Sequence, residues 1–594
     1  MDFSAVRHFS YDSFCYPLDA DSLQVNVQTG SDVLSVRLVY GDPFKGKLDG
    51  GKWSWERSRA DMESRRLPGA LFWSATVRPE FKRCKYYFEI RADDGTWLFF
   101  EDGFYRSEGE DVPVEASPFI FPWMNESDIV SPPKWAEETV WYQIFPSRFC
   151  RGGDGGGDFL PWADSSHAVR NEERYGGNLL GIIDRLGYLE ELGINGLYIN
   201  PINLSVSQHK YDTADYLTID PEFGTGAILR RLVDEAHARG MRVMLDGVFN
   251  HSGWEFFAWQ DVIKNGEKSR YAGWFMVNDY GFEKTPCDNA ERGAYFSFAF
   301  ADRMPKLNTN NPEVREYFCS VCEKWARDYG IDAIRLDVAN ELSHTFCRSL
   351  RERLLSVKKD FFIAGEIWND STPWLRGAEF DSVINYPLRS AIWRFASDPE
   401  KDVRFLESEL NRCLVRYTRQ TVRVLINQMD SHDTMRLVTR MDGDKDMALL
   451  QFALILSLPG AACMYYGTEI LLPGGEDPDC RRCMPWKDIE EGAFDDVLGF
   501  MRELVWLRRN SPALKSDELS FRFLQNDLNG RRRVVILEKR DESSGEHVEC
   551  LFNFGRAPFA VSSCGVVGSA DIALSRRLEG GLLLPGGFAV VRRR

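Results

Sequence analysis

Residues Gly330-Ile-Asp-Ala-Ile-Arg-Leu-Asp-Val-Ala-Asn-Glu341 decide how the rest of the chain is interpreted. The segment begins at a glycine, continues as a short apolar run and reaches a carboxylate, which is typical of a buried parallel strand that carries an acid to its C-terminal edge. Arg335 and Asp337 lie two residues apart, so on a strand their side chains point to the same face. A guanidinium keeps a neighbouring carboxylate ionised, and an ionised carboxylate can act as a nucleophile. Taken alone, the pattern fits a structural ion pair equally well.

Two further segments have the same form. Phe361-Phe-Ile-Ala-Gly-Glu366 is an apolar run that ends on a carboxylate, and the run from Val422 ends on His432-Asp433. Three parallel-type strands that each carry an acid to the carboxyl end indicate the top face of a (β/α)₈ barrel. If the first two strands are neighbours, they lie about 4.8 Å apart. Asp337 and Glu366 would then be near the separation of about 5–5.5 Å that retaining glycosidases use.

Four motifs resemble, in the same order, the four short regions of the α-amylase family of glycoside hydrolases. They are Asp246-Gly-Val-Phe-Asn-His251, Ile334-Arg-Leu-Asp-Val-Ala-Asn-Glu341, Gly365-Glu-Ile-Trp368 and Asp430-Ser-His-Asp433. Met304-Pro-Lys-Leu-Asn308 and Val338-Ala-Asn-Glu341 are similar, more specifically, to the neopullulanase, cyclomaltodextrinase and maltogenic amylase subgroup. The resemblance covers nearly the whole chain. It implies a retaining α-glucan hydrolase acting on cyclodextrins, pullulan or short maltooligosaccharides, with transglycosylation and the choice between α-1,4 and α-1,6 bonds left open.

The resemblance also implies a role for each matching residue. Asp337 would be the nucleophile, Glu366 the general acid and then base, and Asp433 the carboxylate that grips the 2- and 3-hydroxyls while the ring distorts. Asp246 would support the site rather than react. The implied substrate-binding residues are Tyr211 beneath the sugar, His251, Arg335 and His432 around it, Trp368 and Glu341 on the leaving-group side, and Asp477 and Arg481 toward the non-reducing end.

No metal and no cofactor are expected. Related enzymes place a calcium site at the start of the barrel, with Asn and Asp ligands, but this chain has Cys150-Arg151 and Asn178 at the matching positions. Calcium needs several oxygen ligands, so these changes make the site doubtful. Two C-x-x-C pairs, at 319–322 and 480–483, could together bind zinc. The first lies on a predicted barrel helix and the second in a loop near the substrate, which disfavours a shared metal.

The 594 residues are too many for a single core. Residues 1–116 alternate short apolar segments with Gly, Asp and Pro, which predicts an N-terminal β-sandwich, and residues 117–135 resemble a packed linker. Strands and helices alternate over 136–510, as an α/β barrel requires. About sixty residues separate the third strand from the next helix, so 251–310 are predicted to form an inserted domain. The alternating pattern returns over 511–594 and predicts a C-terminal β-sandwich.

Charge and composition restrict the partners. The 90 acidic residues exceed the 73 basic ones and give a net charge of −17, which argues against nucleic acid and anionic membranes as partners. We find no signal peptide pattern, no apolar run long enough to span a membrane and, among 13 cysteines, no disulfide framework. A cytoplasmic protein is expected. The subgroup resemblance further implies a homodimer, in which the carbohydrate-binding-type module at residues 1–116 narrows the active site of the partner subunit.

Two alternatives from other functional classes remain open. A non-catalytic carbohydrate-binding or scaffolding relative would have lost a catalytic carboxylate, and this sequence keeps all three. A barrel enzyme for sugar phosphates would carry a phosphate-binding glycine loop after its late strands. Ser431-His-Asp-Thr434 is not such a loop, whereas Gly474-Gly475 leaves this alternative open.

Overall fold

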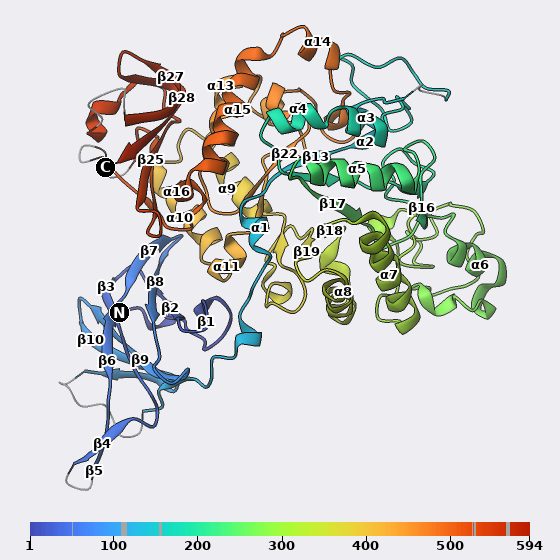
Figure 1. Ribbon diagram of the computed structural model, residues 1–594. Helices are drawn as coiled ribbons and strands as arrows, with labels where there is room; N and C mark the ends of the chain where they lie inside the picture. Colours follow the sequence, from blue (N-terminus) through green and yellow to red (C-terminus); the bar gives the residue numbers. More distant parts are fainter. Residues whose placement is uncertain are drawn as a thin grey trace. The chain divides into compact units, whose positions relative to one another are not determined.

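A computed structural model describes residues 1–49, 52–107, 116–153, 157–524, 527, 530–565 and 571–593 (Figure 1). The chain divides into two units. One contains Met1–Ser131 and Asp398–Val422, and the other contains Pro132–Ser397 and Arg423–Arg594. No helix in the described part of the chain is both long and apolar enough to span a bilayer.

The second unit is built on an eight-stranded parallel sheet in the order β20-β19-β18-β17-β14-β13-β22-β21. A parallel bridge between Ile384 and Ile426 joins the two ends of this order, so the sheet closes and the predicted (β/α)₈ barrel is confirmed. Its strands are β13 (Val140–Ile144), β14 (Gly196–Ile199), β17 (Arg242–Gly247), β18 (Ala333–Leu336), β19 (Phe362–Gly365), β20 (Ser382–Val383), β21 (Ile426–Asn427) and β22 (Ala461–Tyr465).

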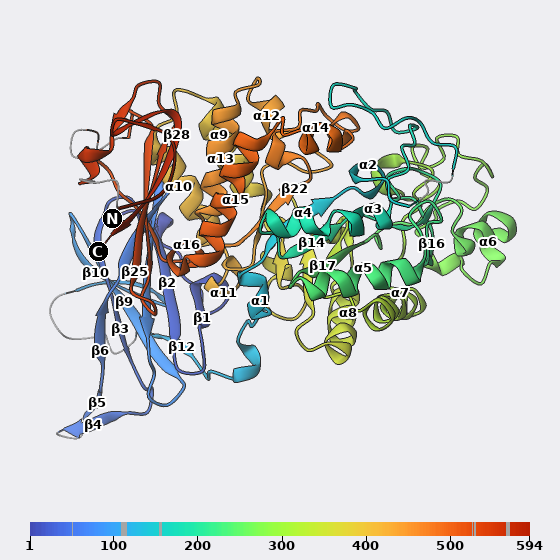
Figure 2. The same cartoon turned by 45° about the horizontal axis from the view of Figure 1, so that its top comes forward.

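Helices surround the strands (Figure 2). They are α3 (Leu179–Asp184), α4 (Leu186–Glu191), α5 (Gly226–Ala238), α7 (Pro312–Lys324), α8 (His344–Val357), α9 (Tyr386–Ser397), α13 (Lys445–Leu456) and α15 (Asp495–Asn510). Local signals set their ends. The Asn311 side chain caps α7 ahead of Pro312, and Gly330 adopts a left-handed φ of 76° between the end of the helical segment and β18.

Buried acids at the amino ends of the barrel strands hold the central strands in register. Asp332 precedes β18 and accepts a hydrogen bond of 2.8 Å from the backbone N–H of Val243 in β17. It is also paired with His237 and Arg242, at 2.7 and 2.9 Å. Asp381 makes the equivalent bond, of 2.9 Å, to the N–H of Ile363 in β19. These pairings fix where each strand ends, and therefore where the residues after it emerge.

Two connections above the barrel carry extra structure. After β14, strand β15 (Asn203–Ser205) pairs antiparallel with β16 (Thr213–Ile219). The predicted insertion at 251–310 contains α6 (Phe257–Asn265) and several short helical turns. An antiparallel bridge between His251 and Lys306 joins the two ends of this insertion.

The first unit contains a β-sandwich of two antiparallel sheets, ordered β1-β2-β8-β7 and β11-β10-β9-β3-β6. The predicted linker differs in part, because β12 (Phe119–Phe121) pairs with β9 and belongs to the sandwich. Helix α10 (Val403–Leu414) also belongs to the first unit, and its Asn411 side chain donates a 3.0 Å bond to the carbonyl of Arg66. The main strands are β1 (Cys15–Pro17), β2 (Leu23–Gly30), β3 (Val33–Gly41), β6 (Ser58–Asp61), β7 (Glu63–Leu67), β8 (Ala70–Val77), β9 (Cys84–Ala92), β10 (Gly95–Phe100) and β11 (Gly103–Arg106).

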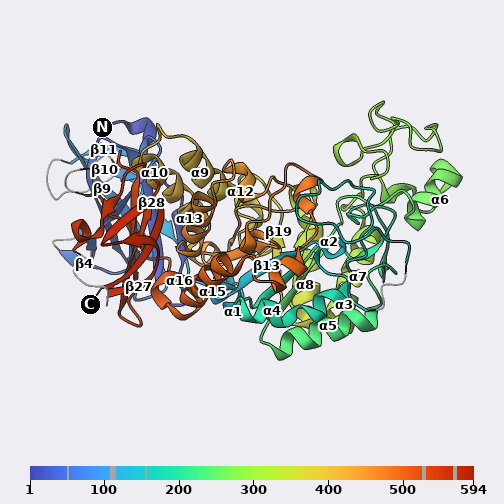
Figure 3. The ribbon, with the colours of Figure 1, turned by 90° about the horizontal axis from the view of Figure 1, so that it is seen from above.

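The C-terminal region is a six-stranded antiparallel sheet domain that lies in the same unit as the barrel. Its longest strand, β28, lies beside α13 (Figure 3). An ion pair of 3.1 Å between Arg576 and Asp496 links this domain to α15. Its strands are β23 (Leu519–Phe521), β24 (Val534–Asp541), β25 (Glu546–Asn553), β26 (Phe559–Ala560), β27 (Ile572–Glu579) and β28 (Leu582–Arg593).

Candidate active site

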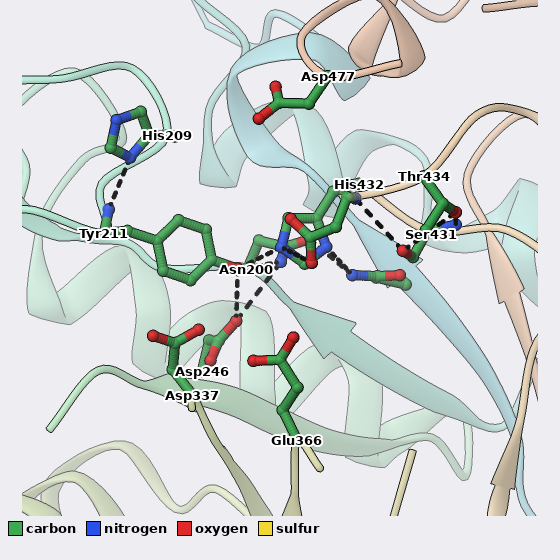
Figure 4. A network of polar contacts seen from close by, with 12 residues as sticks. Asn200, His209, Tyr211, Asp246, Asp337, Glu366, Ser431, His432, Thr434 and Asp477 are labelled. Atoms are coloured by element: carbon green, nitrogen blue, oxygen red, sulfur yellow. Dashed lines mark hydrogen bonds and ion pairs between the residues drawn. The ribbon is translucent and has the colours of Figure 1, made fainter. Parts of the chain in front are cut away.

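Three acids meet at the carboxyl ends of three adjacent strands. Asp246 lies in β17, Asp337 directly follows β18, and Glu366 directly follows β19. Leu336 is paired with Gly365 in the parallel ladder, so the two acids that follow emerge side by side. Figure 4 shows the three carboxylates gathered in one place. The spacing of about 4.8 Å between neighbouring strands matches the close separation used by retaining glycosidases.

Arg335 binds all three acids through one guanidinium group. Its Nη1 atom lies 2.6 Å from Asp246 Oδ1 and 2.9 Å from Asp337 Oδ1, and its Nη2 atom lies 2.7 Å from Glu366 Oε2. Arg335 is only 1 % exposed. Charge-assisted hydrogen bonds of this length are strong and directional. Arg335 is therefore the counter-charge around which the candidate site is assembled.

The two oxygens of Glu366 have different surroundings. Oε2 accepts the Arg335 contact and a 3.1 Å hydrogen bond from the backbone N–H of Val338. Val338 has a φ of 44°, a left-handed conformation that is costly for a β-branched residue and that sends this N–H toward the acid. Oε1 instead accepts hydrogen bonds from Trp368 Nε1 at 3.1 Å and from the Tyr386 hydroxyl at 3.4 Å.

Crowding and burial favour the protonated form of Asp246, Asp337 and Asp433. Burial raises the pKa of Asp337, and the charges of Glu366 and Asp246 raise it further, while Arg335 acts in the opposite direction. Burial and the charge of Glu366 raise the pKa of Asp433 to about 7. Arg335 is thus the nearby charge that opposes this shift and favours the ionised form of Asp337.

A chain of polar contacts runs from Tyr211 to the late strands (Figure 4). The Tyr211 hydroxyl donates to Asp246 Oδ2 at 3.0 Å and lies 2.5 Å from His432 Nε2. The Gln143 amide lies 2.8 Å from His432 Nδ1, so this nitrogen accepts and Nε2 carries the hydrogen. Burial lowers the pKa of His432, which keeps the ring neutral. The rings of Tyr211 and His432 are nearly parallel, with 7° between their planes.

A second cluster connects Asp433 to the loop after β22. Arg481 pairs with Asp477 at 2.9 Å and approaches Asp433 at 3.6 Å. Its Nε atom donates to the carbonyl of His432 at 2.9 Å. His432 Nε2 lies 3.2 Å from Asp433 Oδ2. The structure therefore brings four predicted residues together beside the three acids.

The remaining predicted residues occupy two different environments. His251 is buried, and its Nε2 atom donates to the backbone carbonyl of Tyr211 at 3.1 Å, so it supports the backbone that carries the Tyr211 ring. Trp368 and the Glu341 side chain are each 45 % exposed. Glu341 pairs with Lys306 at 2.6 Å, which links the end of the insertion to the strand that carries Asp337.

Sequence reasoning missed several residues that contact the site. Gln143 and Asn200 lie in none of the four motifs, yet both belong to the hydrogen-bond network around His432 and Asp246. Tyr386 is the first residue of α9, and Arg389 lies one turn further along the same helix. The only available signal was that polar residues follow barrel strands, which is too general to select these positions.

Gly474-Gly475, which kept a sugar-phosphate enzyme as an alternative function, does not form a phosphate-binding loop. The backbone N–H of Gly474 donates to the Thr439 hydroxyl at 2.9 Å, and that of Gly475 donates to Asp479 Oδ2 at 2.7 Å. Backbone N–H groups that already bind side-chain oxygens are not available to a phosphate.

At the start of the barrel, a cationic side chain occupies the region where the resemblance implied calcium. Arg151 places its guanidinium there and donates to the carbonyls of Tyr175 and Leu160 at 2.9 and 2.8 Å. The Asn178 oxygen caps α3 by accepting from the N–H of Gly181 at 2.8 Å. A cationic side chain thus binds carbonyl oxygens, which are the kind of ligand that calcium prefers. Across the described residues there is no cluster of three or more His, Cys, Asp or Glu arranged to hold a metal ion.

Comparisons with known protein families agree with this geometry. Residues 143–517 match the family described as "Alpha amylase, catalytic domain", and residues 1–125 match "Alpha amylase, N-terminal ig-like domain". The first match alone covers more than half of the chain and contains every acid of the candidate site.

Individual proteins are similar over most of their length. A cyclomaltodextrinase of Geobacillus thermopakistaniensis is 39 % identical over 554 residues, covering 91 % of this chain and 92 % of that protein. An intracellular maltogenic amylase of Bacillus subtilis is 38 % identical, covering 87 % and 86 %. Neopullulanase 2 of Thermoactinomyces vulgaris is 39 % identical, covering 86 % and 85 %. A solved cyclomaltodextrinase structure superposes with a TM-score of 0.86 at 32 % identity, covering 100 % of this chain and 98 % of that one.

Proposed function

The chain belongs to the α-amylase family of glycoside hydrolases, and from this premise we propose that it is a retaining α-glucan hydrolase of the cyclomaltodextrinase, neopullulanase and maltogenic amylase type. The observation that carries the proposal is the pairing of Asp337 and Glu366 on adjacent strands through the single guanidinium of Arg335. The intact set of acids disfavours a non-catalytic relative. Neighbouring strands about 4.8 Å apart favour the separation of about 5–5.5 Å between carboxyl groups in retaining enzymes over the roughly 6.5–9.5 Å of inverting ones.

The first half of the reaction follows from the two carboxyl groups. The Asp337 carboxylate attacks the anomeric carbon and forms a glycosyl–enzyme ester, while the bond to the leaving oxygen breaks. Glu366 gives its proton to that oxygen, so the shortened glucan leaves as an alcohol. Tyr211 lies beneath the ring, and Asp433 and His432 bind hydroxyls that move as the ring flattens.

The second half reverses these roles. Glu366, now a carboxylate, takes a proton from water, and the resulting nucleophile attacks the anomeric carbon and releases Asp337. If a sugar hydroxyl replaces water, the same step transfers the glycosyl group to it. Arg335 stays bound to the acids throughout and balances the charge that moves between them.

We propose cyclodextrins, pullulan and short maltooligosaccharides as the substrates, because the names of the similar proteins indicate this class. Product analysis on β-cyclodextrin, pullulan and soluble starch side by side tests the proposal. We expect β-cyclodextrin to be hydrolysed faster than starch, with maltose as the main product. An enzyme that releases no maltooligosaccharide from any of the three substrates would contradict it.

We further propose a homodimer that forms through the N-terminal sandwich. Phe44 and Phe81, on the surface of this unit, are 73 % and 44 % exposed. The Arg83 guanidinium lies 4.7 Å from the Phe44 ring and 5.9 Å from the Phe81 ring. An exposed aromatic and cationic surface of this kind is typical of an interaction site.

Light scattering tests the dimer directly. The intact chain should have twice the 68.2 kDa mass of one chain. The double substitution Phe44→Ser and Phe81→Ser should shift the mass toward one chain and lower the ratio of β-cyclodextrin to starch activity, since a partner's sandwich would no longer wall the cleft. As a control, Leu34→Ser changes a residue on β3 that is 56 % exposed, and it should change neither the mass nor the activity ratio. A chain that is monomeric at all concentrations would exclude the dimer.

We propose that the enzyme needs no calcium, because Arg151 provides a fixed positive charge where a metal would otherwise link the carbonyls of the loop. EDTA should therefore leave the thermal midpoint unchanged, whereas Arg151→Met should lower it by several degrees. A midpoint that falls in EDTA and returns with added calcium would contradict this proposal, since a ligand that binds only the folded state stabilises it.

A cytoplasmic location is also proposed. All thirteen cysteines, each within the described residues, are free thiols, which fits a reducing compartment. One of the similar Bacillus subtilis proteins is named intracellular. Fractionation of the source cells, with the activity followed in each fraction, tests this assignment.

A further inference from the structure

Tyr386 and Arg389 lie outside every family motif, but Tyr386 contacts Glu366 and Arg389 packs against the Tyr386 ring. Tyr386 is 3 % exposed and Arg389 is 8 % exposed. The Tyr386 and Trp368 rings are stacked, with centroids 3.8 Å apart and planes 6° apart. The Arg389 guanidinium lies 4.8 Å from the Tyr386 ring and 5.4 Å from the Trp368 ring. The three side chains therefore form one packed unit, the Tyr386 stack.

The Tyr386 stack donates hydrogen bonds to one of the two carboxyl oxygens of Glu366. Trp368 and Tyr386 both donate to Glu366 Oε1, whereas Arg335 and the Val338 N–H hold Oε2. An oxygen that already accepts from a guanidinium and an amide is a poor position for a proton. The proton that Glu366 delivers to the leaving group is therefore carried on Oε1, beside the stack.

Tyr386 can serve both protonation states of Glu366. The Trp368 indole N–H can only donate, but a phenol hydroxyl can donate or accept. When Glu366 is a carboxylate, Tyr386 donates to Oε1. When Oε1 carries the proton and no substrate is bound, the hydroxyl turns and accepts a hydrogen bond from that proton without displacing its ring. A bound leaving oxygen then replaces the hydroxyl as the acceptor. Tyr386 keeps its own proton throughout, so the proton gained by the leaving group comes from Glu366 alone.

Arg389 accounts for the firm placement of the ring. Its Nη1 atom is buried and has no hydrogen-bond partner in the described part of the chain, so the aromatic faces are a main part of its surroundings. Burial lowers the pKa of Arg389, and the nearby carboxylates of Asp430 and Asp433 act in the opposite direction. Burial raises the pKa of Tyr386, so the phenol keeps its proton, and the positive charge of Arg389 acts in the opposite direction.

We propose that Tyr386 is a positioning residue that aims the Oε1 proton of Glu366 at the leaving oxygen, with Trp368 and Arg389 fixing its ring. This inference rests on the proposed function, because it requires Glu366 to be the general acid. It assigns the three side chains a shared role in proton delivery.

The test uses two substrates that differ in their need for a proton. A sugar leaving group needs protonation by Glu366, whereas fluoride leaves from α-maltosyl fluoride without it. Tyr386→Phe removes the hydroxyl and keeps the stacked ring. We expect kcat/KM on maltotriose to fall about tenfold or more, and kcat/KM on α-maltosyl fluoride to change by less than about twofold. Arg389→Met should give the same selective loss, smaller in size.

Two reference variants make the result decisive. Tyr317→Phe is the matched control, because its ring packs against Phe256 and Trp274, away from the acids, and both rates should be unchanged. Glu366→Gln should show the selective loss in its largest form. Equal losses on both substrates in Tyr386→Phe, or no loss at all, would overturn the positioning role and leave the proposed function intact. A Glu366→Gln variant without selective loss would overturn the acid assignment, and the inference with it.

Discussion

Asp337→Asn should abolish turnover while leaving the fold and substrate binding intact. The amide has the same shape as the carboxylate but is a very poor nucleophile, and loss of a nucleophile costs several powers of ten in rate. Asp337 is 5 % exposed and bonded to Arg335, so an isosteric change keeps the packing around it. The measurements are kcat/KM on β-cyclodextrin, the thermal midpoint, and substrate binding by calorimetry.

A matched control makes this result specific. Asp234→Asn makes the same chemical change on the exposed face of α5, where Asp234 pairs with Arg230, and it should leave all three quantities unchanged. An Asp337→Asn variant that keeps more than about a hundredth of the wild-type rate would show that another group is the nucleophile.

Among the substitutions considered, Arg335→Met should have the largest effect after Asp337→Asn, and it should lower both activity and stability. It leaves Asp246, Asp337 and Glu366 in a buried site without their shared counter-charge. Removing one partner from a buried ion pair costs about 3–5 kcal/mol. Activity should fall by several powers of ten, because Asp337 would then hold a proton and lose its nucleophilic form.

The stability loss should depend on pH in a defined direction. Burial already raises the pKa values of Asp246 and Asp337, and losing the guanidinium raises them further. A folded state that binds protons more tightly than the unfolded chain gains stability as the pH falls. The difference in thermal midpoint between Arg335→Met and wild type should therefore be large at pH 8 and smaller at pH 5. An equal difference at both values would contradict the assigned role of Arg335.

The barrel and its acids could be predicted because the relevant information is local. Each strand is a short apolar run followed by a polar residue, and parallel strands place such residues at one end of the barrel. Asp337 and Glu366 belong to consecutive strands, so their proximity follows from chain order. The prediction that Arg335 and Asp337 share a face agrees with their 2.9 Å contact.

Other features depend on contacts between distant segments, and no local pattern encodes them. Residues 398–422 lie between two barrel strands in sequence but belong to the first unit, through contacts such as that of Asn411 with Arg66. Val338 is β-branched, which disfavours its left-handed φ, and the bond that it donates to Glu366 depends on a residue of the next strand segment. The stack of Tyr386 on Trp368 likewise joins residues eighteen positions apart.

The anomeric form of the first product tests the central claim most directly. Proton NMR during early hydrolysis of β-cyclodextrin, before mutarotation, distinguishes the two anomers. Double displacement through Asp337 inverts the anomeric carbon twice, so the new reducing end should appear first as the α-anomer. A β-anomer as the first product would mean a single displacement by water, and would contradict the assignment of Asp337 and Glu366 as nucleophile and acid–base of a retaining hydrolase.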